Sequence, residues 1–268
     1  MRTSSGKSFA AAACGRLVLL AVLFCARPLA AAPVKVRFTE GVGHAFLLLR
    51  TLDGVQIASG ELLQIVRLGA VENRMTFRFK DGSLFDETVV FSQDGVFGMR
   101  SYGLVQRGPA FAEDTVISLN RISGEYSVTT TAHNSAQGET LAGTLELPAD
   151  VYNGMMLTVA KNLPKETGAT VHIVAFTPKP VLMELDIELG KDHDVLVGDL
   201  VKSATHFLLK PRPGAWIEFF AKLIGRMPSD YHAWVLTDEA PAFVKFEGPL
   251  DPKGPVWQIE LTSPRWPD

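Results

Sequence analysis

Apolar and polar residues alternate along the segment 34–147, which is the pattern of strands with one buried face and one wet face. The stretch "RMTFRFKDGSLF" is typical, because its methionine and phenylalanines fall on one side and its arginines on the other. Asp-Gly pairs at 53–54, 81–82 and 94–95 supply the positive φ angles that tight hairpin turns require. Short strands joined by such turns predict an antiparallel meander.

One segment, "LPADVYNGMMLTVAKNLPKETGA", breaks this alternation. Its apolar residues recur every four positions from Val151 through Met155 and Val159, which is the spacing of an amphipathic helix. Asp150 is a residue type that favours the N-cap, and a proline and a glycine follow the apolar stripe. The sequence therefore predicts one helix from about Asp150 to Asn162.

Strand-like alternation resumes after this helix and is interrupted once more, by "PGAWIEFFAKLIGRMP" at 213–228. That stretch has helical spacing and is apolar over most of its circumference. The predicted fold is mainly β with some α (α+β): a curved antiparallel sheet or incomplete β-barrel wrapped around the central helix, with a second short apolar helix. We expect one domain, 32–268, within which 32–147 and 148–268 are possible lobes.

The first 31 residues have the three-part layout of a secretory signal peptide. Basic residues, among them Arg2, Lys7 and Arg16, precede the apolar run "LVLLAVLFCA", and the small-residue stretch "LAAAP" follows it. An apolar run this short does not span a bilayer, which takes about 20 residues. We therefore expect cleavage after Ala31, export to the periplasm, and no transmembrane segment in the mature chain.

Loss of the signal peptide would change the chemistry open to the protein. Cys14 and Cys25 would both be removed, so disulfides and thiolate chemistry are not expected in the folded domain. A lipid anchor on Cys25 is not expected either, because Phe24 stands before it where a small residue is needed. The remaining 22 basic and 29 acidic residues give a net charge of −7, without the basic tract that nucleic-acid binding requires.

The densest cluster of possible metal ligands is "GKDHDVLVGD" at 190–199. Neighbouring residues on a strand point to opposite sides, so at most Asp192 and Asp194 could converge on one ion. The two flanking segments are strand-like, and the residues 190–194 between them have the composition of a hairpin loop. The sequence favours a turn here, with His193 in solvent, and no metal site.

No catalytic motif emerges. The histidines lack metal-ligand spacing, and His172 and His206 are expected to face outward or to form cross-strand pairs. A serine-nucleophile elbow, a phosphate loop and a dinucleotide fingerprint are absent. The adjacent acid pairs are interpreted as solvated turns or strand ends: Asp86 and Glu87, Glu113 and Asp114, Asp238 and Glu239. We therefore expect no enzyme and no cofactor, although carboxylates from distant strands could still form a site.

The helix that opens with "LPADVYNGMMLTV" and the closing segment "YHAWVLTDEAPAFVKFEGPLDPKGPVWQIEL" carry a resemblance. Together with the export signal and the meander, they resemble a broad group of bacterial periplasmic envelope proteins similar to the lipoprotein carriers LolA and LolB. The resemblance implies an incomplete antiparallel barrel wrapped around helices, with an apolar hollow for acyl chains. It covers most of the mature chain in the order of its elements and has no sharp motif.

Bulky apolar side chains on the two predicted helices are of the type that lines lipid-accepting hollows. The residues expected to line or gate such a hollow are Met155, Met156, Trp216, Phe219, Phe220 and Trp234. The predicted function is binding of an apolar or lipid-like ligand by an exported envelope protein. The alternative is a structural or interaction module with a filled core and an envelope protein as partner.

Overall fold

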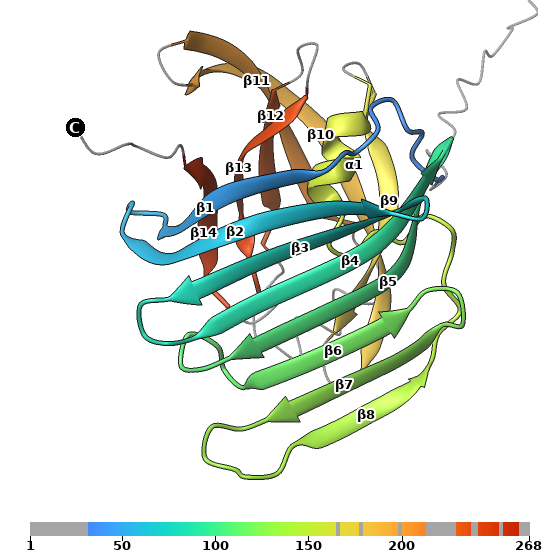
Figure 1. Cartoon of the computed structure of the whole chain (residues 1–268), viewed down its shortest axis with the longest axis vertical. Helices are drawn as coiled ribbons and strands as arrows, with labels where there is room; N and C mark the ends of the chain where they lie inside the picture. The colour runs from blue at the N-terminus through green and yellow to red at the C-terminus, as the bar shows by residue number, and fades with distance from the viewer. Residues whose placement is uncertain are drawn as a thin grey trace, which may run out of the picture.

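The computed structural model describes residues 32–164, 167–176, 179–197, 200–212, 229–236, 241–251 and 254–262. Fourteen strands in these ranges form one antiparallel sheet, and the described residues hold one short helix, α1 (Met156–Asn162) (Figure 1). The strands are β1 (Gly43–Thr51), β2 (Gln56–Arg67), β3 (Ala70–Phe79), β4 (Leu84–Asp94), β5 (Val96–Arg107), β6 (Asp114–Asn120), β7 (Glu125–Thr131), β8 (Glu139–Thr144), β9 (Ala169–Phe176), β10 (Pro180–Val197), β11 (Leu200–Pro211), β12 (Tyr231–Leu236), β13 (Ala242–Pro249) and β14 (Val256–Thr262).

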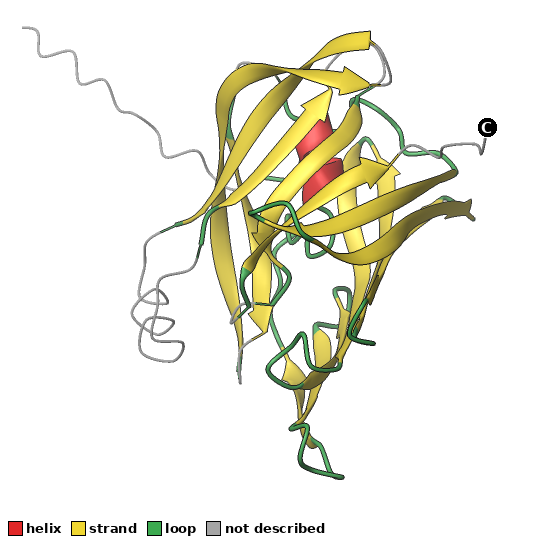
Figure 2. Ribbon diagram, turned by 90° about the vertical axis from the view of Figure 1, so that its left-hand side faces the viewer, coloured by secondary structure: helices red, strands yellow, loops and turns green. Residues whose placement is uncertain are grey.

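The sheet consists of two meanders joined by a single long-range pairing. Its order is β8-β7-β6-β5-β4-β3-β2-β1-β14-β13-β12-β11-β10-β9, so β1 pairs with β14 and the outer strands are β8 and β9. The sheet does not close, and its strands curve around α1 (Figure 2). The predicted mainly-β, antiparallel and unclosed architecture is confirmed, and the two halves of the chain share one sheet.

The predicted hairpin turns lie where the Asp-Gly pairs place them. Gly54, Gly82 and Gly95 have φ angles of +89°, +89° and +71°, a region that glycine enters without steric cost. In the β2–β3 turn two successive residues have positive φ angles, Leu68 at +49° and Gly69 at +73°, and leucine is poorly suited to this region. Alternation along the strands places phenylalanines and aliphatic residues on the concave face, where they form the hydrophobic core.

The helix is shorter than the periodicity predicts, and the expected start at Asp150 is wrong. Gly154 has a φ of +69°, which no helix contains, so α1 begins at Met156 with Met155 at its N-cap. The residues before Gly154 run beside β9: His172 N donates to Asp150 O, and Tyr152 N donates to His172 O. These pairings with the edge of β9 compete successfully with the first helical turn.

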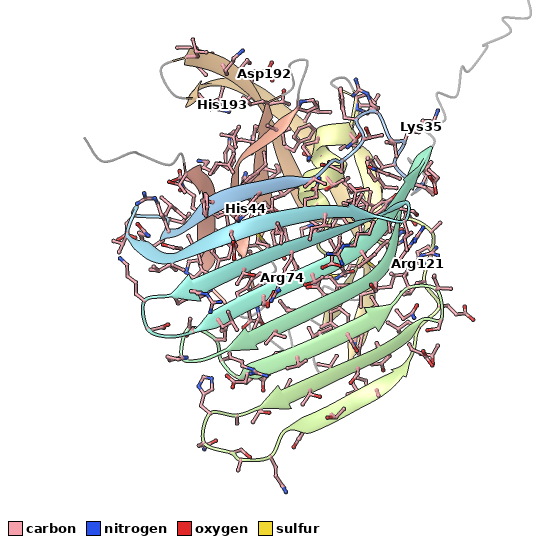
Figure 3. All side chains as sticks on the ribbon, viewed as in Figure 1. Lys35, His44, Arg74, Arg121, Asp192 and His193 are labelled. Atoms are coloured by element: carbon pink, nitrogen blue, oxygen red, sulfur yellow. The ribbon has the colours of Figure 1, made fainter. Side chains whose placement is uncertain are left out.

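The stretch 190–194 is not a turn, which corrects the prediction from its composition. It lies within β10, where Asp192 and Asp194 pair with Thr205 and Ser203 on β11 (Figure 3). The pairing extends to Val197 opposite Leu200, so the chain reverses after this stretch. The register shifts between Leu189 and Asp192, and this β-bulge accommodates the extra polar residues.

The second predicted helix, at 213–228, and the predicted signal peptide, at 1–31, lie outside the described residues. Within the described part of the chain, no helix has the length and apolar character needed to cross a membrane.

Candidate functional site

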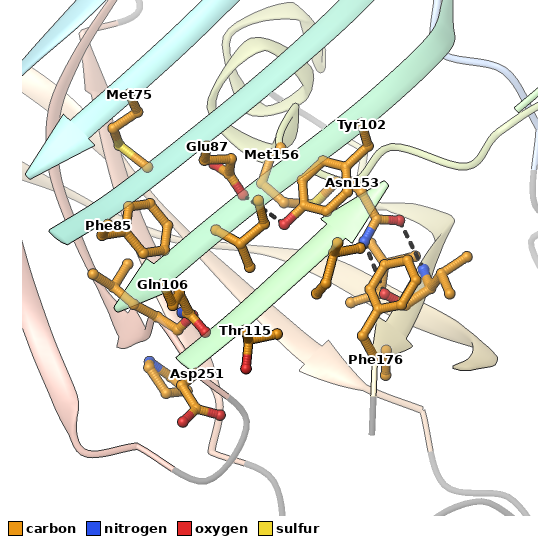
Figure 4. A pocket seen from close by; sticks show the side chains of 18 of the residues that line it. Met75, Phe85, Glu87, Tyr102, Gln106, Thr115, Asn153, Met156, Phe176 and Asp251 are labelled. Carbon is orange, nitrogen blue, oxygen red and sulfur yellow. Dashed lines mark hydrogen bonds between the residues drawn. The ribbon is translucent and has the colours of Figure 1, made fainter. Parts of the chain in front are cut away.

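The concave side of the sheet encloses a cavity of about 720 Å³. Its walls are contributed by β2–β8, by β9–β14 and by the start of α1 (Figure 4). Most of the residues that line it are apolar, and the volume falls in the usual range for small-molecule sites. The alternation of the strands accounts for the apolar wall of this cavity, because most of the apolar residues of each strand share the concave face.

One row of cavity residues crosses seven neighbouring strands. Successive cross-strand pairs link Leu62, Met75, Glu87, Leu104, Ile117, Val128 and Leu141, from β2 to β8. All seven line the cavity, and Glu87 is the one charged member of the row. Six strand spacings of about 4.8 Å make this row roughly 29 Å long. The concave face therefore offers an extended apolar path with a single carboxyl group in it.

Glu87 lies in the middle of β4, between Phe85 and Val89 on the concave face. Its side chain keeps some accessible surface because it faces the cavity, yet protein surrounds it closely. The resulting loss of hydration raises the pKa of Glu87 to about 7, although a hydrogen bond from Tyr102 favours the charged form. Tyr102 Oη donates this bond to Glu87 Oε1 over 3.0 Å (Figure 4).

Two neighbours hold Tyr102 in place. Its ring stacks on Phe176, with 6.1 Å between centroids and 8° between planes. A Cβ added at Gly154 would lie 3.3 Å from the Tyr102 ring and 3.2 Å from Val89 Cβ. The glycine turn ahead of α1 thus allows the chain to approach Tyr102 closely.

An unsatisfied hydrogen-bond acceptor, the side-chain oxygen of Asn73, lies close to Glu87. Asn73 lines the cavity from β3, and its Oδ1 is buried without a hydrogen-bond partner among the described residues. Asn73 is opposite Val89, and Met75 is opposite Glu87, so Asn73 and Glu87 are diagonal neighbours on one face. The backbones of such neighbours are roughly 7–8 Å apart, and their longer side chains can approach each other more closely.

A second row of cavity residues, which is polar, runs beside the apolar row, two residues further along β5. Gln106, Thr115, Thr130 and Glu139 are successive cross-strand partners on β5–β8, and all of them line the cavity. Gln106 Nε2 donates to Leu250 O over 2.8 Å, which ties β5 to the segment after β13. The cavity is therefore apolar along its middle and polar along one border.

The residues predicted to line a hollow occupy different places. Met156 lines the cavity, whereas Met155 is fully buried in the core beneath the start of α1. Trp216, Phe219 and Phe220 lie outside the described residues. Trp234 lies on the opposite, outer face of the sheet and does not line the cavity.

On that outer face, Trp234 belongs to an aromatic cluster. Its ring stacks on His206 with 4.7 Å between centroids, and Lys245 Nζ lies 4.0 Å from the Trp234 ring centroid. His206 Nε2 and His232 Nδ1 share a hydrogen bond of 2.9 Å, and burial lowers the pKa of His206. His206 thus takes part in cross-strand contacts, as the sequence predicts. His193 is exposed, also as predicted.

Glu87 is the residue that sequence reasoning misplaces. We interpreted Asp86 and Glu87 as a solvated pair, but they point to opposite faces of β4. Asp86 faces outward, where Arg74 Nε donates to its Oδ1 over 2.8 Å and hydrogen bonding with Arg74 lowers its pKa. The signal for Glu87 is its register, because Phe85, Val89 and Phe91 share its parity in "LFDETVVF".

No group of three or more histidine, cysteine or acidic side chains is placed to hold a metal ion within the described residues. Comparison of the chain with protein-family models, with curated proteins and with solved structures finds no match.

Proposed function

We propose that this chain is an exported envelope protein that binds an apolar or lipid-like ligand in the cavity of its open sheet. The observation that carries the proposal is the cavity of about 720 Å³ with its row of apolar residues from Leu62 to Leu141. Binding sites for small apolar molecules are concave, mostly apolar and few per protein. A path of roughly 29 Å across the strands suits an extended chain better than a compact ring.

Two further elements of the proposal come from the sequence. The predicted signal peptide at 1–31 would deliver the protein to the periplasm, and the resemblance to LolA and LolB implies an acyl-chain ligand. Architecture alone does not specify activity, so the proposal is lipid binding in general, and carriage of lipoproteins is one form of it. The contrasting role is a structural module that uses its surface to bind an envelope protein.

Native mass spectrometry of protein purified without detergent provides the first test. After incubation with envelope lipids, the binding function predicts a species with the added mass of a lipid. A chain that remains free of lipid under these conditions contradicts it.

Two variants show whether binding occurs in this cavity. Ile117 lines the cavity, whereas its neighbour Val116 on β6 faces outward and is 39% exposed. Ile117→Trp should fill part of the cavity and reduce binding of the neutral probe N-phenyl-1-naphthylamine, whereas Val116→Trp should not. Leu141→Trp, on the outer strand β8, provides a second cavity-filling variant if Ile117→Trp folds poorly. Equal probe binding by the Leu141 and Val116 variants contradicts the cavity as the binding site.

A further inference from the structure

The charge of the cavity wall selects among possible amphiphiles. Among the described residues that line the cavity, four carry carboxyl groups, Glu87, Glu113, Glu139 and Asp251, and one, Lys179, is basic. An anionic head group, such as that of a fatty acid, would face this excess of negative charge. A cationic head group would be attracted to it.

Glu87 lies within the apolar row, and no cationic side chain among the described residues is paired with it. Its hydrogen-bonding partner among the described residues is Tyr102 Oη, which contacts one of its two carboxylate oxygens. Among the described residues no donor contacts its other oxygen, Oε2, and the buried Asn73 Oδ1 likewise has no partner there. Buried acceptors cost free energy unless a donor satisfies them, and an ionised carboxylate costs most.

The inference drawn from these observations rests on the proposed function and specifies its ligand. We propose that the cavity binds a cationic amphiphile head-first, with a primary ammonium group donating to Glu87 Oε2 and Asn73 Oδ1. Its chain would lie along Leu104, Ile117, Val128 and Leu141, toward the outer strand β8. An ammonium group has three donors, enough to satisfy both acceptors and one further oxygen.

The groups around Glu87 carry no charge of their own near pH 7, so Glu87 provides the charge that an ammonium group would bind. Leu104 lies opposite Glu87 on β5 with Tyr102 diagonal to it, Asn73 and Met75 lie on β3, and Met156 lines the cavity from α1. Burial, followed by Glu87 and Tyr231 on β12, raises the pKa of Tyr102, and burial raises the pKa of Tyr231 to about 12. Both tyrosines therefore stay neutral around pH 7, and Glu87 supplies the negative charge at this point of the cavity.

Competition with N-phenyl-1-naphthylamine tests the head-group preference. The competitors are dodecylamine, dodecanol and dodecanoate, which share one chain length and differ in head-group charge. We expect dodecylamine to bind about 10- to 100-fold more tightly than dodecanoate or dodecanol, the range for a charged hydrogen bond. Dodecanoate that binds as tightly as dodecylamine overturns the proposal.

Glu87→Gln locates the preference, because it removes the charge and keeps the shape. In this variant the affinity for dodecylamine relative to that for dodecanol should fall by about tenfold or more. Asp86→Asn, which makes the same chemical change on the outer face, should retain the preference. A preference for dodecylamine that survives Glu87→Gln overturns the assignment to Glu87.

The pH dependence gives a second readout. Glu87 has a pKa of about 7, so dodecylamine should bind about tenfold more tightly at about pH 8 than at about pH 6. Glu87→Gln should abolish most of this difference, and a pH dependence equal to that of the wild type argues against the ion pair. The binding assays distinguish failure of this inference from failure of the proposed function. If the probe binds without any amine preference, the head-group assignment alone is wrong, whereas absence of all probe and chain binding removes both.

Discussion

Glu87 should make the protein less stable as the pH rises through neutrality, and Glu87→Gln should remove that dependence. The pKa of Glu87 rises from its ordinary 4.5 to about 7 in the folded chain, chiefly because burial disfavours the carboxylate. Between these values the folded state holds more protons than the unfolded state. The stabilising contribution is thus complete below about pH 4.5 and is lost as the pH rises through 7.

The size of the effect follows from the same two values. Each tenfold change in proton affinity is worth roughly 1.4 kcal/mol, so the full change is about 3 kcal/mol, of which about 2.5 kcal/mol falls between about pH 5 and about pH 8. Glutamine cannot ionise but keeps an oxygen to accept the hydrogen bond from Tyr102. The free energy of unfolding of Glu87→Gln relative to wild type should therefore increase by about 2.5 kcal/mol from about pH 5 to about pH 8.

Urea unfolding followed by tryptophan fluorescence, repeated at several pH values, measures the difference. Comparison of variant with wild type at each pH cancels the contributions of all other titrating groups. Asp86→Asn is the matched control, because hydrogen bonding with Arg74 lowers the pKa of Asp86 and moves its titration below this range. If the difference in free energy of unfolding between Glu87→Gln and wild type stays constant from about pH 5 to about pH 8, the reasoning is refuted. Such a result would mean that Glu87 in the cavity is as well hydrated as a carboxylate in water.

Two further substitutions test a buried hydrogen-bonded tyrosine of the cavity wall and a strained hairpin turn. Tyr152→Phe should destabilise the protein by about 2–3 kcal/mol, because the buried Tyr152 Oη accepts from Val34 N (2.8 Å) and donates to Phe97 O (3.1 Å). The Val34 amide should also exchange faster with deuterium, and an unchanged urea midpoint would contradict this role. Leu68→Asn should stabilise by about 1 kcal/mol, because Leu68 is fully exposed at a φ of +49°, where asparagine is less strained. A melting temperature that does not rise would show that the turn relaxes in solution.

The sequence predicts the meander well because its signals are local. Alternation and Asp-Gly turns depend on a few neighbouring residues, and the turns at Gly54, Gly82 and Gly95 form as expected. The start of α1 is less predictable, because Val151 satisfies the helical spacing but is buried beside β9 instead. The choice between helix and edge pairing depends on a strand that lies later in the chain.

The candidate site shows the same limit. Period two places Glu87 on the apolar face, but its acidic neighbour Asp86 makes the pair resemble a solvated strand end. Only the register of β3, β4 and β5 brings Glu87, Asn73 and Tyr102 to one point of the cavity. Similarly, composition predicts a turn at 190–194, whereas the β10–β11 register carries the strand past it to Val197.

The sheet stays open because the edge of β9, one of its two edge strands, is already paired. The free edge of β9 is occupied by the segment before α1, since Asp150 and Tyr152 bond to the His172 backbone. Asn153 continues this pairing with its side chain: its Nδ2 donates to Val174 O, and its Oδ1 accepts from Val174 N, both over 2.8 Å. With these backbone groups satisfied, β9 cannot pair there with β8 and close the sheet. The segment that leads into α1 therefore covers the edge of β9 and keeps the sheet open between β9 and β8.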